Sequence, residues 1–240
     1  MRARVLVSVV TLPALLAMVG PAQARPVQID MTDAFNEDVI VNGTTLGNLD
    51  ETQTSVDIFE TSFITKGAAQ VLPNCVEDPD GLPNAGRVAA NEEHPLVNLA
   101  YDNRKNGKNA RRSPEPDSYR VSVPHRRYRA IHVFATSGNG VSVMNVKLLY
   151  GASSPPAELF LVQDWFGSPG FGYALIDGRD RANPDASTCH DDDTTAIWGF
   201  KVKAKSRRTL RAVKITRPAS DEDESVLNVF GMTGTPAGRR

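Results

Sequence analysis

The sequence contains little cysteine and, after its first 24 residues, no long apolar run. Only 2 of its 240 residues are cysteines, and neither has a second cysteine or paired histidines at the spacing of a metal-binding motif. No later segment approaches the roughly 18 consecutive apolar residues that indicate a membrane-spanning helix. The sequence therefore predicts neither a cysteine-based metal site nor a transmembrane helix in the body of the chain.

The sequence also lacks the short motifs of well-known catalytic centres. It contains no G-x-S-x-G nucleophile elbow and no H-E-x-x-H metal-binding helix. Glu158 and Asp164 are candidates for the two carboxylates of a glycosidase, but nothing in the sequence separates them from ordinary surface acids. We therefore predict no catalytic residues, and we keep a glycan hydrolase or lyase as an alternative.

Neither sign of charge predominates. The chain has 27 Lys and Arg against 28 Asp and Glu, a net charge of −1, so it has no global attraction for nucleic acid. Basic residues nevertheless gather in 104–112 and 201–211, and acidic residues in 191–193 and 221–224. These runs are either solvated surface or, for the basic ones, a face for an anionic polymer such as an acidic polysaccharide.

The first 24 residues have the three parts of a secretory signal peptide. Arg2 and Arg4 are followed by a 15-residue apolar run, Val5–Val19, and Ala22-Gln23-Ala24 places small residues where a signal peptidase cleaves. A retained anchor is the alternative, but a spanning helix needs roughly 20 apolar residues. We predict a secreted or extracytoplasmic protein whose mature chain begins near Arg25.

Export makes a disulfide between the two cysteines the expected state. In an oxidising compartment, a single pair such as Cys75 and Cys189 favours one bridge over two free thiols. The bridge would close a loop of more than 100 residues, for which the chain-entropy model gives about 4–5 kcal/mol.

The mature sequence predicts many strands and almost no helix. Tyr119–Val123 alternates and ends at Pro124, where a strand loses a backbone donor, and Tyr128–Thr136 leads into a turn at Ser137–Gly140. Nine or ten such strands are expected, at residues 27–31, 61–65, 97–101, 119–123, 128–136, 141–150, 158–164, 197–202, 210–216 and 226–232. Short strands separated by Gly, Pro, Asn and Asp indicate an all-β sandwich.

The strand pattern also divides the mature chain. Residues 25–60 are predicted as an N-terminal strand with an irregular arm, because 43–57 is polar and poorly periodic. Residues 61–234 are predicted as the β-sandwich domain. Residues 235–240 are predicted as a disordered tail.

An ordered series of motifs runs through residues 95–233. An Asn-rich loop at 101–110 precedes the strand Arg129–Thr136, and Val146–Gly151 then ends in Tyr-Gly. Asp164-Trp165 follows, and Asn228–Thr233 closes the series. In this order the motifs resemble the galactose-binding-like jelly-roll domains of secreted bacterial carbohydrate-active proteins. The resemblance implies a jelly-roll β-sandwich that recognises a glycan through loops at one end.

Five residues are candidates for contact with a glycan. Trp165 offers the largest aromatic face for stacking on a sugar, and the adjacent Asp164 can accept sugar hydroxyls. Tyr173 adds an aromatic ring at the end of a glycine-rich loop, and Asn103 and Arg104 offer an amide and a guanidinium. The alternatives are structural: a packed corner for Trp165 with Asp164 capping a turn, and an ordinary turn for Asn103 and Arg104.

Three aspartates are candidates for a structural Ca²⁺ site. Asp177, Asp180 and Asp185 lie close in sequence and carry the oxygen ligands that Ca²⁺ prefers, although they lack the spacing of a defined calcium loop. No other cofactor is indicated.

Three functions therefore follow from the sequence. The first is an exported non-catalytic module that binds a glycan or cell-wall polymer. The second is a structural or protein-interaction component of the cell envelope, which a buried Trp165 would favour. The third is the glycan hydrolase or lyase already named.

Overall fold

The computed structural model describes residues 25–52, 54–101, 107–151, 153–219 and 224–238. The predicted signal peptide lies outside these ranges. None of the helices among the described residues is long and apolar enough to cross a membrane.

Strands dominate the described chain, and they number thirteen where the sequence predicted nine or ten. They are β1 (Val27–Ile29), β2 (Ile40–Val41), β3 (Ser62–Ile64), β4 (Arg87–Val88), β5 (Val97–Asn98), β6 (Arg111–Ser113), β7 (Asp117–Gly138), β8 (Ser142–Leu149), β9 (Glu158–Val162), β10 (Tyr173–Ala182), β11 (Cys189–Lys203), β12 (Thr209–Arg217) and β13 (Val226–Pro236). One short α-helix, α1 (Lys66–Ala69), and two 3-10 turns, η1 (Thr32–Ala34) and η2 (Leu46–Asn48), complete the elements.

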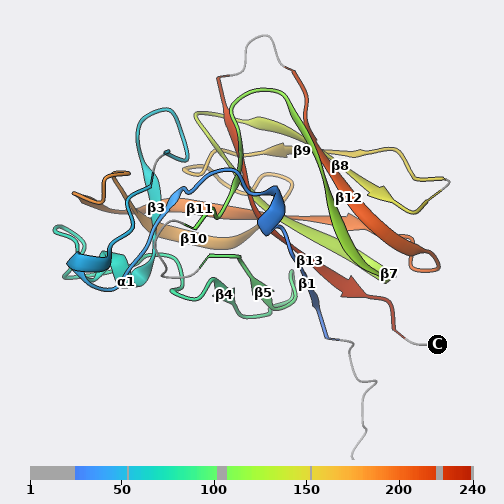
Figure 1. The fold of residues 1–240 in the computed structure, drawn as a ribbon, viewed down its shortest axis with the longest axis horizontal. Coiled ribbons are helices and arrows are strands. Elements are labelled where there is room, and N and C mark those ends of the chain that lie inside the picture. The colour runs from blue at the N-terminus through green and yellow to red at the C-terminus, as the bar shows by residue number, and fades with distance from the viewer. Residues whose placement is uncertain (1–24, 53, 102–106, 152, 220–223, 239–240) are drawn as a thin grey trace, which may run out of the picture.

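Eleven strands form one mixed sheet whose two halves are joined by β7 (Figure 1). The order is β2-β3-β10-β11-β7-β12-β8-β9, and β13 pairs with β7, β1 and β6. The first half of β7 pairs with β12, whereas its second half pairs with β11 and β13. The strands β4 and β5 form a separate two-stranded sheet.

The strand β7 runs through Pro124, at which the sequence predicted a strand end. Opposite this part of β7, the register of β12 shifts between Leu210 and Ala212, so the ladder is already irregular where the proline lies. A proline costs least at such a point, because no regular ladder bond is required of it. The Tyr128 hydroxyl also donates to the Pro124 carbonyl, at 2.9 Å. The two predicted strands are therefore one long strand with a bulge.

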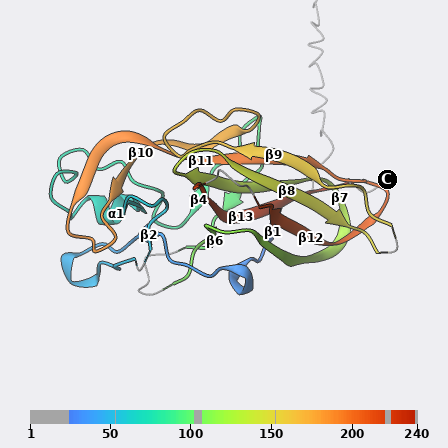
Figure 2. The same cartoon turned by 90° about the horizontal axis from the view of Figure 1, so that it is seen from above.

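The two halves of the sheet face each other across one apolar core. Val121 and Val146 come from the half with β12, Val133 and Trp198 come from the other half, and all four lie in the same buried cluster. Across this core, the ring centroids of Phe160 on β9 and Phe200 on β11 lie 5.4 Å apart. Figure 2 shows these strands extending along the long axis of the molecule. The predicted all-β, sandwich-like fold is confirmed.

The irregular chain between β1 and β6 covers the outer face of the second half. Successive strand residues point to opposite faces, so Phe134 faces away from the core that its neighbour Val133 enters. Phe134 packs instead in a second buried cluster, with Val39, Phe63 and Phe230. Val39, which lies in the segment predicted as an irregular N-terminal arm, is therefore part of the layer that covers this face.

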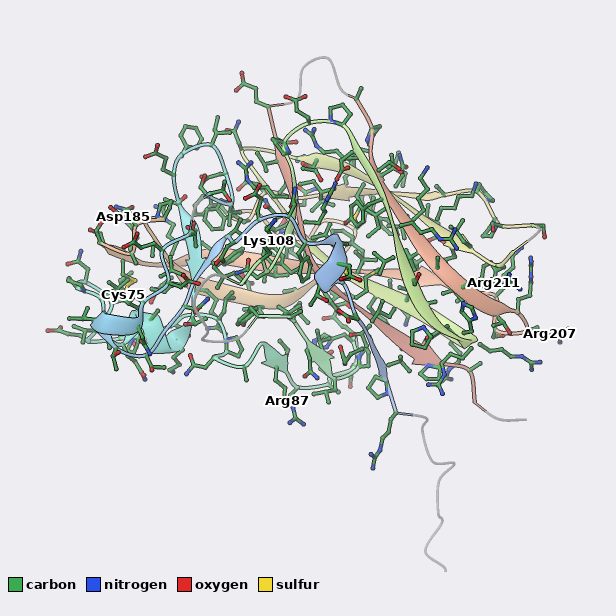
Figure 3. All side chains as sticks on the ribbon, in the orientation of Figure 1. Cys75, Arg87, Lys108, Asp185, Arg207 and Arg211 are labelled. Atoms are coloured by element: carbon green, nitrogen blue, oxygen red, sulfur yellow. A yellow bond between two sulfur atoms is a disulfide. The ribbon has the colours of Figure 1, made fainter. Side chains whose placement is uncertain are left out.

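A disulfide closes one end of the molecule. Cys75, which follows α1, is bonded to Cys189 at the start of β11, with 5.8 Å between their Cα atoms. The predicted bridge is confirmed. Figure 3 places Cys75 at the end of the molecule opposite Arg207 and Arg211.

The last strand extends further than predicted. Thr235 and Pro236, assigned to a disordered tail, belong to β13 and pair with Ala130 and Tyr128 of β7. The prediction was wrong for these two residues because pairing with β7 orders a segment whose own composition does not indicate a strand.

Candidate functional site

Trp165 is fully buried, at 0% exposure, so neither of its faces is open to a sugar. Its ring meets Phe63 edge-on with 5.0 Å between centroids, and its backbone N–H donates to Ser137 at 2.8 Å. The Asp164 carboxylate accepts from the N–H groups of Gly140 (2.5 Å) and Phe166 (3.0 Å). The structure therefore corrects the expected stacking role: this dipeptide forms a packed corner, and the carboxylate caps its turns.

Tyr173 is also buried, at 8% exposure, and it belongs to a group with two histidines. Its hydroxyl lies 2.8 Å from Nδ1 of His132, and its ring stacks on His94 with 5.5 Å between centroids. Burial raises the pKa of the Tyr173 hydroxyl well above its usual value. Tyr173 therefore packs inside the covered face of the sheet.

The other two predicted glycan contacts, Asn103 and Arg104, lie outside the described residues.

The three aspartates proposed for Ca²⁺ do not form a common ligand cluster. Asp180 is fully buried and accepts from the Asp80 backbone N–H at 3.0 Å, whereas Asp177 and Asp185 are exposed. Each exposed carboxylate accepts from a backbone N–H close by in the chain, Asp177 from Gly178 and Asp185 from Ser187. Among the described residues, Asp180 groups instead with the two bridged cysteines, whose sulfurs are already bonded to each other.

The described residues form an open hollow of about 500 Å³ at the disulfide-bearing end of the molecule. Its lining comes from three separate stretches of chain: the loop before β3, the strand β6, and the turn between β10 and β11. The lining residues are Thr54, Ser55, Phe59, Glu60, Arg112, Asn183, Pro184 and Asp185. Figure 3 shows Asp185 at this end.

A buried carboxylate shapes the first wall of the hollow. Asp57 is 2% exposed and accepts from the Phe59 N–H (2.9 Å) and the Thr61 hydroxyl (2.8 Å), which closes the loop into a turn. The backbone supports this turn, because Val56 N–H donates to Thr61 at 2.9 Å. Glu60 accordingly takes a left-handed conformation, with φ of 59°. The loop is therefore held firmly while Phe59 at its tip is 69% exposed.

The second wall is the turn that connects β10 and β11. The Asn183 N–H donates to Thr188 at 3.0 Å, and the Pro184 carbonyl accepts from the Thr52 N–H at 2.8 Å. The second bond ties the turn to the chain that leads into the first wall. The pKa of Asp185 is lowered by the hydrogen bonds from Ser187, so its exposed carboxylate is ionised at neutral pH.

Arg112 forms the floor between the two walls. Its Nε donates to the Ser55 carbonyl at 2.8 Å, and a terminal nitrogen donates to the Asp57 carbonyl at 3.3 Å. Burial lowers its pKa from the usual value, yet a guanidinium remains charged at any physiological pH. A guanidinium carries five N–H donors, so these bonds leave donors free to meet a ligand oxygen.

The hollow thus combines one exposed aromatic ring, a cation, carboxylates, an amide and hydroxyls. Of the predicted site residues that the structure describes, only Asp185 lines it, and the sequence predicted a different role for Asp185. For the loop that forms the first wall, the sequence contains one indication of a binding surface. Ile58 and Phe59 are two large apolar residues within a polar, poorly periodic segment. Arg112 and Asn183 carry no such signal, because they are brought beside this loop only by the fold.

Neither a scan against protein-family models nor a search of curated proteins finds a match to this chain.

Proposed function

We propose that this protein is an exported, non-catalytic carbohydrate-binding module whose glycan lies in the hollow between the loop at residues 54–60 and the turn at 183–185. The observation that carries the proposal is Phe59: a large apolar side chain, 69% exposed, at the tip of a loop that a buried carboxylate holds in place. Apolar side chains that are exposed side by side indicate a binding surface better than single ones do, and Ile58, next to Phe59, is also 49% exposed.

The chemistry around Phe59 suits a neutral or weakly charged sugar. An aromatic face packs against the apolar C–H face of a pyranose, while the hydroxyls at its edge need both donors and acceptors. Arg112 supplies donors, and Asp185 and Glu60 supply acceptors on opposite walls. With a cation and carboxylates together, the hollow has no single sign of charge that would favour a polyanion.

Two further observations support export and sugar recognition. The Cys75–Cys189 disulfide suits an oxidising compartment, as the signal-like start of the chain requires. The sandwich-like fold also suits the galactose-binding-like family that the order of motifs resembles, and members of such families bind ligands through loops at the ends of the sandwich.

The experiment is a glycan-array screen on the exported protein, followed by calorimetric titration of the best ligand. We expect saturable binding that Phe59→Ala weakens by about tenfold or more, because the stacking surface is lost. The matched control is Phe171→Ala, which removes an even more exposed phenylalanine, at 85%, that does not line the hollow.

Equal loss in both variants, or full affinity in Phe59→Ala, would overturn the location of the site. Absence of binding to any glycan would overturn the function, and would leave the envelope-interaction alternative, which the buried Trp165 also favours.

A further inference from the structure

The near-zero net charge of the chain conceals a strong separation of positive and negative residues within the sandwich. Residues 118–157 and 194–220 together contain thirteen Lys or Arg and no Asp or Glu. They include the strands β8 and β12, nearly all of β7 and the second half of β11. All acidic residues of the chain lie outside these two segments, so every charged Lys, Arg, Asp or Glu side chain within the segments is positive.

Three of these cations surround a second hollow. Arg127 and Arg129 of β7 and Arg207 of the turn between β11 and β12 line an open space of about 430 Å³, together with Ser206. The backbone brings them together, because Thr209 pairs with Arg127, and Ala204 N–H donates to the Arg129 carbonyl at 2.9 Å. Figure 3 places Arg207 and Arg211 at the end opposite Asp185.

Among the described residues, no acidic side chain lines this hollow. Two ion pairs of the described chain, Arg111–Asp117 and Arg179–Asp80, lie away from the arginine hollow. All three arginines are exposed. Like charges around one hollow repel one another and produce a local positive potential, which a bound anion relieves.

We propose that this arginine hollow is a second binding site, distinct from the one around Phe59, and that it takes an anionic polysaccharide carrying carboxylate or sulfate groups. The planar guanidinium group binds such oxyanions through paired N–H donors, and three of them around one space match a branched or repeated anionic group. Exposed Arg211 and Lys214 on β12 extend the positive surface beyond the hollow, as a polymer would require.

The lining favours a polysaccharide over other polyanions. Among the described lining residues there is no aromatic side chain, whereas proteins that hold single-stranded nucleic acid use aromatic rings on which bases stack. The described part of the lining also has no large apolar side chain of the kind that inserts into a lipid surface. The described lining is thus suited to charged groups alone.

The test measures binding of the exported protein to polygalacturonate and to dextran sulfate, with neutral dextran as the blank, over a range of NaCl concentrations. The two polymers distinguish carboxylate from sulfate. We expect binding that weakens steadily as salt rises, because exposed charge pairs are screened. The triple variant Arg127→Ala, Arg129→Ala, Arg207→Ala should bind at least about tenfold more weakly, as expected from three surface ion pairs.

The matched control is Lys66→Ala, Arg87→Ala, Lys108→Ala, which removes the same net charge from exposed positions elsewhere. Equal loss in both triple variants would show attraction by net charge only and would overturn the site. Single-stranded DNA or phosphatidylglycerol vesicles binding more tightly than both polymers would overturn the ligand class.

If the triple variant fails to fold, the charge reversal Arg207→Glu, confined to the turn, gives the same test. Phe59→Ala should leave polyanion binding unchanged, so failure here and failure of the proposed function remain distinguishable.

Discussion

The hydroxyl of Tyr173 lies 2.8 Å from Nδ1 of His132, inside the covered face of the sheet. The Tyr173 ring occupies the space above Gly199, where an added Cβ would come within 2.2 Å of it. His132 is 2% exposed, and burial, followed by the charges of Lys201 and His94, lowers its pKa from 6.5 to about 4. The imidazole of His132 is therefore neutral when it lies beside the Tyr173 hydroxyl at neutral pH.

This pair predicts that the contribution of His132 to stability falls as the solution is acidified from pH 6.5 to about pH 4. In that window the unfolded chain binds a proton on His132 that the folded protein does not bind, so protonation favours unfolding. The contribution is fully present above pH 6.5 and amounts to about 3 kcal/mol at most. Urea unfolding at a series of pH values measures it.

The contribution of His132 is the difference between the wild-type and His132→Gln curves, because burial raises the pKa of Asp38 to about 7 and Asp38 therefore acts in the opposite direction in this window. His125→Gln, at an exposed histidine, should reproduce the wild-type curve. A His132→Gln protein whose pH dependence matches that of the wild-type protein across this window would show that His132 titrates normally in the folded state.

The disulfide predicts a large loss of stability when it is absent. The double variant Cys75→Ala, Cys189→Ala should unfold about 10 °C or more below the wild-type protein, because a bridge spanning 114 residues strongly restricts the unfolded chain. Calorimetry with and without reductant measures this, and the double variant should be insensitive to reductant. Two titratable thiols in the untreated wild-type protein would contradict the bridge.

The packed corner predicts that Trp165 stabilises the fold. Trp165→Ala should lower the free energy of unfolding by about 3–5 kcal/mol, because it empties the space beside Phe63 in the second apolar cluster. Phe59→Ala, at an exposed ring, should change it by less than about 1 kcal/mol. Chemical denaturation of both variants checks the contrast, and a Trp165→Ala protein of wild-type stability would argue that the ring is exposed in solution.

Periodicity located most of the long strands correctly, because one face of each is buried and the other is not. Val143 to Leu148 of β8 alternates between buried and partly exposed positions, as its sequence indicates. The strand β10 escaped prediction because its ladder with β11 is interrupted by several register shifts, so Tyr173–Ala182 has no regular alternation. Pro124 wrongly predicted the end of a strand for a related reason: a bulge in the pairing with β12 lets the strand β7 continue through the proline.

The sequence also identified the chemistry of candidate site residues without showing which of them are exposed. The type of an aromatic or acidic residue in a loop suggests what it could bind, but residue type alone does not distinguish a ring that stacks on a ligand from one that fills the core. Trp165 and Tyr173 were chosen for their type and proved to be buried, whereas Phe59 lies in a segment that appeared merely irregular.

By itself the sequence determined the all-β class and the one disulfide, since alternation depends on neighbouring residues and two cysteines allow a single pairing. Only the tertiary structure decided which side chains share a surface. The first hollow joins residues 54–60 with Arg112 and residues 183–185, and the second joins Arg127 and Arg129 with Arg207. Both depend on pairing between strands far apart in the chain, and no local pattern encodes such a pairing.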